Sequence, residues 1–261
     1  MKVISLQSGS NGNCFYVETD DVRILIDAGI SGRAAQQRLE QQGRDIREVD
    51  ALFVTHDHSD HSRSVGVFQR KFGMPVYMTR KTLAAIERYG KIGKLDDVRF
   101  FRAGDVCTIG TVQVHSIPTP HDSADGVVFV VDDGKQRAGI LTDLGHVFDG
   151  LREVLKTLNG VIIESNYDEA MLDTGPYPYH LKERIRGSGG HISNRESAEL
   201  LRECAGDRLK WACLCHLSDQ NNSPEAALRT HRESLQAGLQ LYVARRDQCT
   251  EWMILDEGSE D

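Results

Sequence analysis

The sequence predicts an α/β protein in which two mixed β-sheets are flanked by helices, built as one domain over residues 1–261. Three observations carry this prediction. The chain opens with closely spaced strand-like segments, its middle is rich in strands separated by Gly and Asp-Gly turns, and its last third alternates helices with strands. A chain of 261 residues with 39% hydrophobic residues is also long and apolar enough to bury a large core.

The first part of the chain is predicted to contain five strands and three helices. Its opening strands lead into an Asp-Ala-Gly turn at 27–29, which favours an antiparallel start. Ser31 is suited to begin a helix that runs to about Gly43, because its side chain can accept a hydrogen bond from the first turn. The predicted strands are 3–7, 14–19, 22–29, 51–55 and 75–79, and the further helices are 64–72 and 81–89.

The remainder of the chain is rich in strands up to about residue 143 and then alternates between the two kinds of element. Runs of valine, isoleucine and aromatic residues that end at turn residues indicate the strands. The predicted strands are 98–101, 106–110, 112–118, 127–133, 137–143, 160–165, 211–216, 239–244 and 250–256. The predicted helices are 149–158, 180–186, 194–205 and 224–237.

Charge and composition argue against several classes of protein. The formal net charge of −8 disfavours a protein that coats nucleic acid non-specifically, although it is compatible with an enzyme that engages a few phosphates through metal ions. No apolar run approaches the roughly 20 residues that span a bilayer, and the N-terminus lacks a secretory signal. We therefore expect a cytoplasmic protein without a membrane partner. Six scattered cysteines without a CxxC pair indicate neither a disulfide scaffold nor a zinc ribbon.

A histidine-rich segment carries the strongest chemical signal. Residues 55–61 read Thr-His-Asp-His-Ser-Asp-His, an HxHxDH pattern at the exit from a hydrophobic strand. His56 and His58 are separated by one residue, so in an extended chain they point to the same side and can bind one metal ion. When the loop turns, Asp60 and His61 can face a second ion. A polar loop would rarely have three histidines and two aspartates in six residues by chance, so the segment predicts a metal site.

A site with two metal ions needs further ligands, and candidates follow other predicted strands. Each alone would more often be a surface or capping residue, but their shared position after a buried strand favours metal binding. The candidates are His121, Asp143, which could bridge both ions, and His216. Cys213 and Cys215 precede His216 in the same strand, and we expect them to be small buried residues on the opposite face.

The HxHxDH motif, a later single histidine, a Thr-Asp pair and a histidine near the end together resemble the motif series of the metallo-β-lactamase fold. The resemblance implies an αβ/βα four-layer sandwich with two divalent metal ions at one edge, bridged by Asp143. It implies that Asp27 is structural and holds the histidine loop, and that Asp60 serves in catalysis as well as in metal binding. The implied ligands of the first ion are His56, His58 and His121. The implied ligands of the second ion are Asp60, His61 and His216.

Further motifs narrow the resemblance to the bacterial WalJ/YycJ-type subfamily. They are Ser8–Asn13, Glu164–Asp168, Gly190–Asn194, His216–Ser218 and Asn221-Asn222. The resemblance implies a metal-dependent phosphodiesterase that acts as a 5′ to 3′ DNA exonuclease, linked to mismatch repair, in which a hydroxide between two zinc or manganese ions attacks phosphorus. One departure is Leu144, where we expect a smaller polar residue; it touches no proposed ligand.

His191 and Glu164 are candidates for proton transfer. By residue type alone His191 could equally be a loop histidine that caps a helix starting near Asn194. The run Gly-His-Ile-Ser resembles the histidine of tRNA-3′-processing relatives, where it acts with a glutamate that Glu164 matches. A carboxylate that is hydrogen-bonded to an imidazole favours its protonated form, so His191 could donate a proton to the leaving oxygen.

Residues that could contact the substrate carry a weaker signal. Ser8, Ser10 and Asn11 lie in a glycine-bearing loop that could bind phosphate through backbone N–H groups, although such loops are frequently just tight turns. Asn221 and Asn222 precede a predicted helix and could simply cap it. The other histidines receive no role: His115, His146, His180 and His231.

Several competing functions stay open at this point. A small cyclic phosphodiester or RNA could be the substrate, and a thioesterase or lactonase could use the same metals. The Glu–His pair favours phosphodiesters, because an alkoxide leaving group needs a proton more than a thiolate does. An iron redox protein is disfavoured because related diiron proteins carry a glutamate where this chain has His58. A non-catalytic metal-binding module fits least well, and the oligomeric state is left open.

Overall fold

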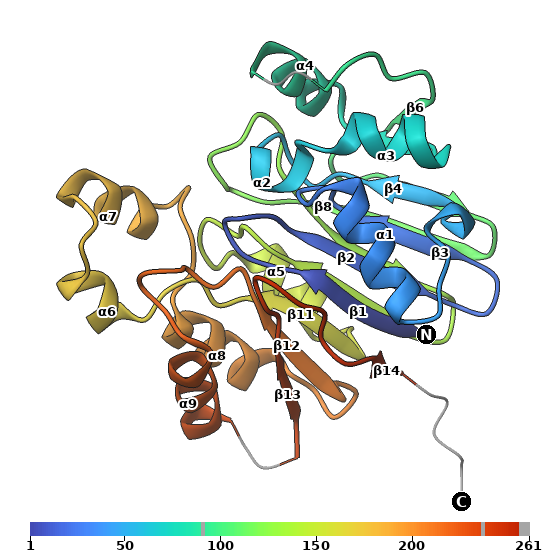
Figure 1. Cartoon of the computed structure of the whole chain (residues 1–261). Helices are drawn as coiled ribbons and strands as arrows, with labels where there is room; N and C mark the ends of the chain where they lie inside the picture. Colours follow the sequence, from blue (N-terminus) through green and yellow to red (C-terminus); the bar gives the residue numbers. More distant parts are fainter. Residues whose placement is uncertain (90–91, 236–237, 256–261) are drawn as a thin grey trace, which may run out of the picture.

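Two seven-stranded sheets lie face to face in the computed structural model, which describes residues 1–89, 92–235 and 238–255 (Figure 1). In spatial order the first sheet is β14 (Met253–Ile254), β1 (Lys2–Gln7), β2 (Cys14–Glu18), β3 (Arg23–Ile26), β4 (Ala51–Phe53), β5 (Val76–Met78) and β6 (Val98–Phe100). The second is β13 (Gln240–Val243), β12 (Trp211–Cys215), β11 (Gly160–Glu164), β10 (Arg137–Leu141), β9 (Val127–Asp132), β8 (Val112–Pro118) and β7 (Val106–Ile109).

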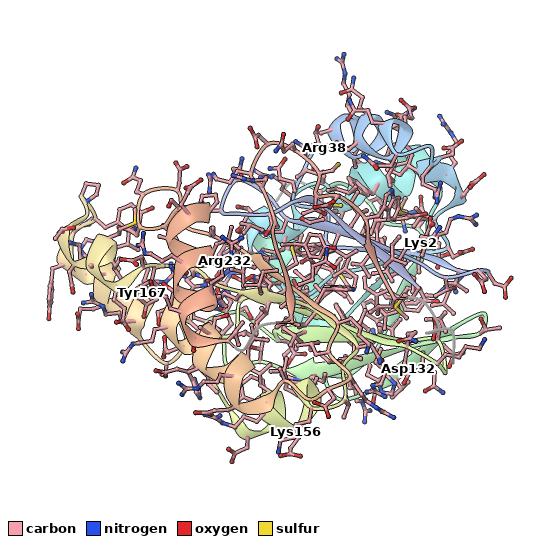
Figure 2. The ribbon with its side chains drawn as sticks, turned by 90° about the horizontal axis from the view of Figure 1, so that it is seen from below. Lys2, Arg38, Asp132, Lys156, Tyr167 and Arg232 are labelled. Atoms are coloured by element: carbon pink, nitrogen blue, oxygen red, sulfur yellow. The ribbon has the colours of Figure 1, made fainter. Side chains whose placement is uncertain are left out.

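Helices cover the outer face of each sheet, which confirms the predicted fold class. The helices on the first sheet are α1 (Gly32–Gln41), α3 (Val65–Phe72) and α4 (Arg80–Tyr89). Those on the second are α5 (Asp149–Leu155), α8 (Asn194–Cys204) and α9 (Pro224–Ser234). Figure 2 shows Arg38 of α1 and Lys156, which directly follows α5, on opposite sides of the molecule. The arrangement is therefore four layers: helices, sheet, sheet and helices.

Alternation along the strands explains the layering. In β9, Val127, Phe129 and Val131 face the core between the sheets, whereas Val128 and Val130 face the helices outside. Successive side chains of a strand point to opposite faces, so an entirely apolar strand is stable where both of its faces are covered. Runs such as VVFVV therefore belong in the middle layers.

The directions of the strands bring several strand ends to one edge of each sheet. β3 and β4 are parallel, as are β10, β11 and β12. β8 runs with β10, because both are antiparallel to β9, and β1 runs with β3, because both are antiparallel to β2. Ligands bind at the carboxyl ends of strands in such sheets, so this edge is where a site is expected.

Most predicted elements are present, with changed ends. Ser31 begins α1 as expected, since its hydroxyl accepts the N–H of Ala34 at 3.1 Å. The strand expected at 250–256 is reduced to β14, and its last residue lies outside the described residues. The helix expected at 224–237 ends at Ser234 because Leu235 is already extended, and residues 236–237 lie outside the described part of the chain.

Three short elements had no counterpart among the predictions. α2 (Ser59–Ser62) forms within the histidine loop, and a 3-10 helix spans Ile46–Glu48. α6 (Glu169–Thr174) and α7 (Tyr179–Arg186) form a helical pair that projects beside the second sheet, of which the sequence pattern predicted α7 alone (Figure 1). This pair has a small apolar cluster of its own, made of Tyr167, Leu172 and Ile185.

The sequence predicted neither a membrane-spanning segment nor a disulfide scaffold. Within the described ranges, no helix has the length and apolar character needed to cross a membrane. All six cysteines are free, and Cys213 and Cys215 are buried between the sheets as expected. His216, however, has a φ of 54°, so a left-handed turn sets its direction and the strand alternation used in the prediction does not apply to it.

Candidate metal centre

The predicted ligands meet where the strand ends of the two sheets converge. The histidine loop follows β4, and the other candidates follow strands of the second sheet: His121 comes after β8, Asp143 after β10 and His216 after β12. Their donor atoms form overlapping groups in which all ligand atoms lie within 4.8 Å of one another. The fold thus brings together at one edge side chains that are far apart in the chain.

The first group contains His56, His58 and His121. The rings of His56 and His58 have centroids 4.7 Å apart, and His58 Nδ1 lies 3.2 Å from His121 Nε2. Burial, followed by the charge of His61, lowers the pKa of His56 well below its ordinary value, which keeps the ring in the neutral form that binds metals. His56 Nε2 is buried without a hydrogen-bond partner among the described residues. Such an atom is costly unless a ligand satisfies it, and three nitrogen donors at this spacing fit a divalent cation.

The second group contains Asp60, His61 and His216. Asp60 Oδ2 lies 3.3 Å from His216 Nε2 and 3.6 Å from His61 Nε2. Asp143 lies between the two groups: its Oδ2 is 3.1 Å from His61 Nε2, and its Oδ1 is 3.6 Å from His216 Nε2 and 3.7 Å from His121 Nε2. These clusters of histidine and aspartate form a site for divalent metal, in which one carboxylate touches donors of both groups.

Several of the predicted histidine ligands also have a hydrogen-bond partner at ring nitrogen Nδ1. His61 Nδ1 lies 2.7 Å from Asp27 Oδ2, and His56 Nδ1 lies 2.9 Å from Thr55 Oγ1. His121 Nδ1 lies 3.0 Å from a glycine carbonyl oxygen. Metal-binding histidines are usually oriented by such a partner on the nitrogen that faces away from the metal. Asp27 is fully buried and also accepts the N–H of Thr55 at 2.8 Å, so it ties the start of the histidine loop to β3.

The carboxylates dominate the electrostatics of the metal-free site. Burial by itself lowers the pKa of His216, but Asp143 and Asp60 outweigh it and raise this pKa to about 10. Burial raises the pKa of Asp60, yet His61 and His216 lower it to about 2. The carboxylates therefore favour a positive charge on His216, which a proton can supply. Metal ions compete with such a proton, because binding requires a neutral imidazole.

His191 lies beside the metal groups and is held by Glu164. His191 Nδ1 is 2.6 Å from Glu164 Oε1 and 3.6 Å from Asp143 Oδ1. Glu164 is fully buried, and its other oxygen accepts the backbone N–H of Leu144 at 2.9 Å. Burial raises the pKa of Glu164, but the adjacent His191 lowers it to about 2, so this carboxylate is ionised at neutral pH. The Leu144 side chain is buried in the apolar layer against the helices, which accounts for a leucine at this position.

The site is open to solvent on one side. The side chains of His58, Asp60 and His191 are 30%, 19% and 15% exposed. The side chains of His61 and Asp143 are at most 3% exposed. A substrate therefore reaches the metal centre past His58, Asp60 and His191.

Backbone strain is concentrated at this edge. In the described part of the chain, the non-glycine residues with positive φ are Asp27 (65°), Asp143 (54°) and His216 (54°). A left-handed conformation costs a non-glycine residue on the order of 1–3 kcal/mol. Each of the three lies within two residues of a strand end, so the turn redirects its side chain from the strand direction into the site.

The residues predicted to bind substrate occupy two different environments. Ser10 and Asn11 are exposed. The buried ones are Ser8, Asn221 and Asn222. Ser8 Oγ accepts the His216 N–H at 2.9 Å, and the amide of Asn222 donates to two backbone carbonyls at 2.8 and 3.1 Å. These contacts favour a positioning role for the buried residues, while substrate contact stays a prediction for Ser10 and Asn11.

Two amide side chains contact the ligands although sequence reasoning gave them no role. Asn13 Nδ2 lies 3.0 Å from His61 Nε2 and 3.5 Å from Asp60 Oδ2. Asn166 Nδ2 lies 3.1 Å from His216 Nδ1 and donates to the His216 carbonyl at 2.8 Å. Both lie inside motifs that carried the subfamily resemblance, and that was the available signal.

Comparison with known proteins agrees with this geometry. The family model of the metallo-beta-lactamase superfamily matches residues 8–216 of the sequence, which include the strand ends and ligands described above. Exodeoxyribonuclease YycJ from Bacillus anthracis is 38% identical over 224 residues, covering 85% of this chain and 84% of the relative. Exodeoxyribonuclease WalJ from Streptococcus pneumoniae is 37% identical over 227 residues, covering 86% of this chain and 84% of the relative.

Solved structures show the same fold. The metallo-beta-lactamase fold protein YhfI from Bacillus subtilis has a TM-score of 0.71 at 14% identity, covering 95% of this chain and 98% of that chain. At this identity the likeness concerns the fold alone. Together with the family match and the two relatives, it shows that the chain belongs to the metallo-beta-lactamase superfamily and, within it, to the YycJ/WalJ type.

Proposed function

We propose that this protein is a metal-dependent exonuclease that hydrolyses the phosphodiester bonds of DNA from the 5′ end, in the service of mismatch repair. The ligand groups and the relatives named exodeoxyribonucleases support this proposal. The site would hold two divalent ions, zinc or manganese, with Asp143 between them. The first would be held by His56, His58 and His121, and the second by Asp60, His61 and His216.

The observation that carries the proposal is the pair formed by Glu164 and His191 beside the metal groups, with 2.6 Å between Oε1 and Nδ1. Hydrolysis of a phosphodiester releases an alkoxide, which needs a proton to leave. The ionised Glu164 accepts a hydrogen bond from His191 Nδ1 and holds the ring in place. As the general acid, His191 would give a proton from Nε2 to the leaving oxygen, and its 15% exposure lets that oxygen reach it.

When bound, the metal ions supply the positive charge that stabilises the phosphoryl oxygens and the acidity that activates an attacking water molecule. The chain's own residues position the ligands and the substrate. Asp27 and Thr55 hold the histidine loop in place, and Asp143 is buried beside both ligand groups. Ser10 and Asn11 at the exposed rim are suited to contact substrate phosphates.

The test uses purified protein with 5′-labelled and 3′-labelled DNA and RNA strands of one sequence, supplied with zinc or manganese after chelation. We expect small labelled products to appear early from 5′-labelled DNA, more slowly from RNA, and not at all without metal. Early release from the 3′ label would contradict the polarity. Faster turnover of a thioester or lactone than of any phosphodiester would contradict the substrate class.

Metal content provides an independent check on the number of ions. The expected stoichiometry is close to two divalent ions per chain, falling towards one in Asp60→Ala. A wild-type stoichiometry of one that Asp60→Ala leaves unchanged would contradict the two-ion site.

A further inference from the structure

A cavity of about 380 Å³ lies directly beside the metal centre. Its lining includes His58 and Arg63 as well as Ile86, Tyr89 and Ile92. His58 thus belongs to the wall of the cavity and to the first ligand group. Figure 1 shows α2 and α4, which contribute to this lining, at the same end of the first sheet. A group in this cavity would therefore be adjacent to whatever is bound at the metals.

Ile86 and Tyr89 of α4, together with Ile92, form the apolar part of the lining. Ile86 and Ile92 are 3% and 6% exposed and belong to the core between the first sheet and its helices, so this part of the wall is firmly packed. Tyr89 is 77% exposed. An aromatic ring that lines a cavity and is largely exposed is suited to stack on another flat ring.

The charges at the cavity suit an anion. Arg63 donates to the carbonyl oxygens of Gly29, at 2.6 Å, and Asn11, which orient its guanidinium without neutralising it. The guanidinium of Arg88 lies 5.3 Å from the centre of the Tyr89 ring. Asp57 is the acidic residue of the lining, and its Oδ1 accepts a backbone N–H at 2.8 Å. Arg63, the arginine of the lining, together with Tyr89 and the two isoleucines, matches a flat base that carries a phosphate.

We propose that this cavity is a nucleobase subsite, in which the base of the nucleotide next to the scissile phosphate stacks on Tyr89 over Ile86 and Ile92. Arg63 attracts the adjoining phosphate. This inference rests on the proposed function and deepens it, because a base can enter the cavity only when it is unpaired. The substrate is therefore a single-stranded or frayed end. Stacking is tolerant of base identity, so the enzyme discriminates weakly between the four bases.

The experiment compares hydrolysis of a single-stranded oligonucleotide with the same strand carrying an abasic residue at the terminal nucleotide or at the next one. Tyr89→Ala should raise KM for the intact strand about 5- to 100-fold, the range expected for the loss of one base–aromatic stack. Its kcat should stay close to that of the wild type, because stacking is equal in the ground state and the transition state. Tyr89→Phe should retain wild-type KM, since stacking needs the ring and not the hydroxyl.

The abasic strands and a second tyrosine supply the controls. For the strand that lacks the stacked base, wild type and Tyr89→Ala should have the same KM. Tyr179 on α7 is 75% exposed and lies outside the lining of this cavity, so Tyr179→Ala should behave as wild type. An equal rise in KM for Tyr89→Ala on intact and both abasic strands, or an equal rise in Tyr179→Ala, would overturn the subsite.

The two proposals fail in different ways. Hydrolysis of oligonucleotides that is insensitive to Tyr89→Ala overturns the subsite and leaves the exonuclease intact. Absence of hydrolysis of any phosphodiester, a simple activated diester included, overturns both. A wild-type preference for blunt duplex over single strands also contradicts the subsite, because a paired base cannot enter the cavity.

Discussion

His216 and His231 are both buried, yet their surroundings change their pKa values in opposite directions. His216 is 4% exposed and lies among carboxylates; burial lowers its pKa, but Asp143 and Asp60 raise it to about 10. His231 on α9 is 0% exposed, and burial lowers its pKa to about 4, partly offset by the carbonyl of Ala227. Burial alone therefore does not distinguish a functional histidine from a structural one.

The neighbours make the difference. His231 Nδ1 lies 2.8 Å from the Ala227 carbonyl oxygen, and its Nε2 lies 3.2 Å from Ser197 Oγ, so a neutral ring is satisfied and links α9 to α8. His216 faces acidic side chains contributed by other strand ends, which favour a positive charge whether it is a proton or a metal ion. A metal centre thus requires convergence of several segments, whereas a packing histidine needs two local partners.

The largest expected effect tests whether Asp143 unites the two ligand groups. Asp143→Ala should abolish detectable hydrolysis and lower metal content, because it removes the carboxylate that contacts donors of both groups. His231→Gln should keep wild-type metal content, since its ring touches no ligand. Metal analysis after gel filtration, with a chelated sample as the zero point, measures both. Full metal occupancy in Asp143→Ala would contradict the view that Asp143 is shared by the two ligand groups.

The second effect separates catalysis from metal binding at the same edge. His191→Ala should retain metal content but lose roughly 10²- to 10⁴-fold in rate, the usual span for a lost general acid. Glu164→Gln should have a milder defect, because Glu164 orients the His191 ring without touching the substrate. Rates are measured on DNA and on a nitrophenyl phosphodiester.

The leaving group decides the role of His191. A nitrophenolate departs without a proton, so the defect of His191→Ala should shrink on that substrate. Equal damage on both substrates would point to phosphate binding instead. Loss of a metal ion from His191→Ala would place His191 among the ligands.

The smallest expected effect concerns stability and pH. The folded pKa of His231, about 4, lies below the value of about 6.5 expected in the unfolded chain, so the unfolded state binds more protons between these pH values. Its contribution to stability is complete above pH 6.5 and is lost as pH falls towards 4, by about 2–3 kcal/mol. Denaturant unfolding at pH 7.5, 6 and 4.5 should show a shallower decline for His231→Gln than for wild type. Parallel declines would contradict the neutral buried ring.

Much of the site could be predicted from local sequence. The HxHxDH segment supplies four donors within six residues, and His121, Asp143 and His216 each follow or end a predicted strand, so residue chemistry and strand pattern indicate them without a structure. The two sheets with outer helices follow from the same periodicity. Short elements such as α2 and α6 escaped prediction because a single helical turn carries too little periodic signal.

The sequence alone therefore determined which side chains are chemically able to hold a metal and which strands precede them, because both are local properties. The tertiary structure decided how these groups meet. The contact of Ser8 with His216 joins residues 208 positions apart. The left-handed backbone at Asp143 and His216 turns their side chains away from the direction that the strand pattern would give them. The cavity at Tyr89 likewise exists only because α4 packs next to the histidine loop. Such distances and directions depend on sheet order and packing, which no local pattern encodes.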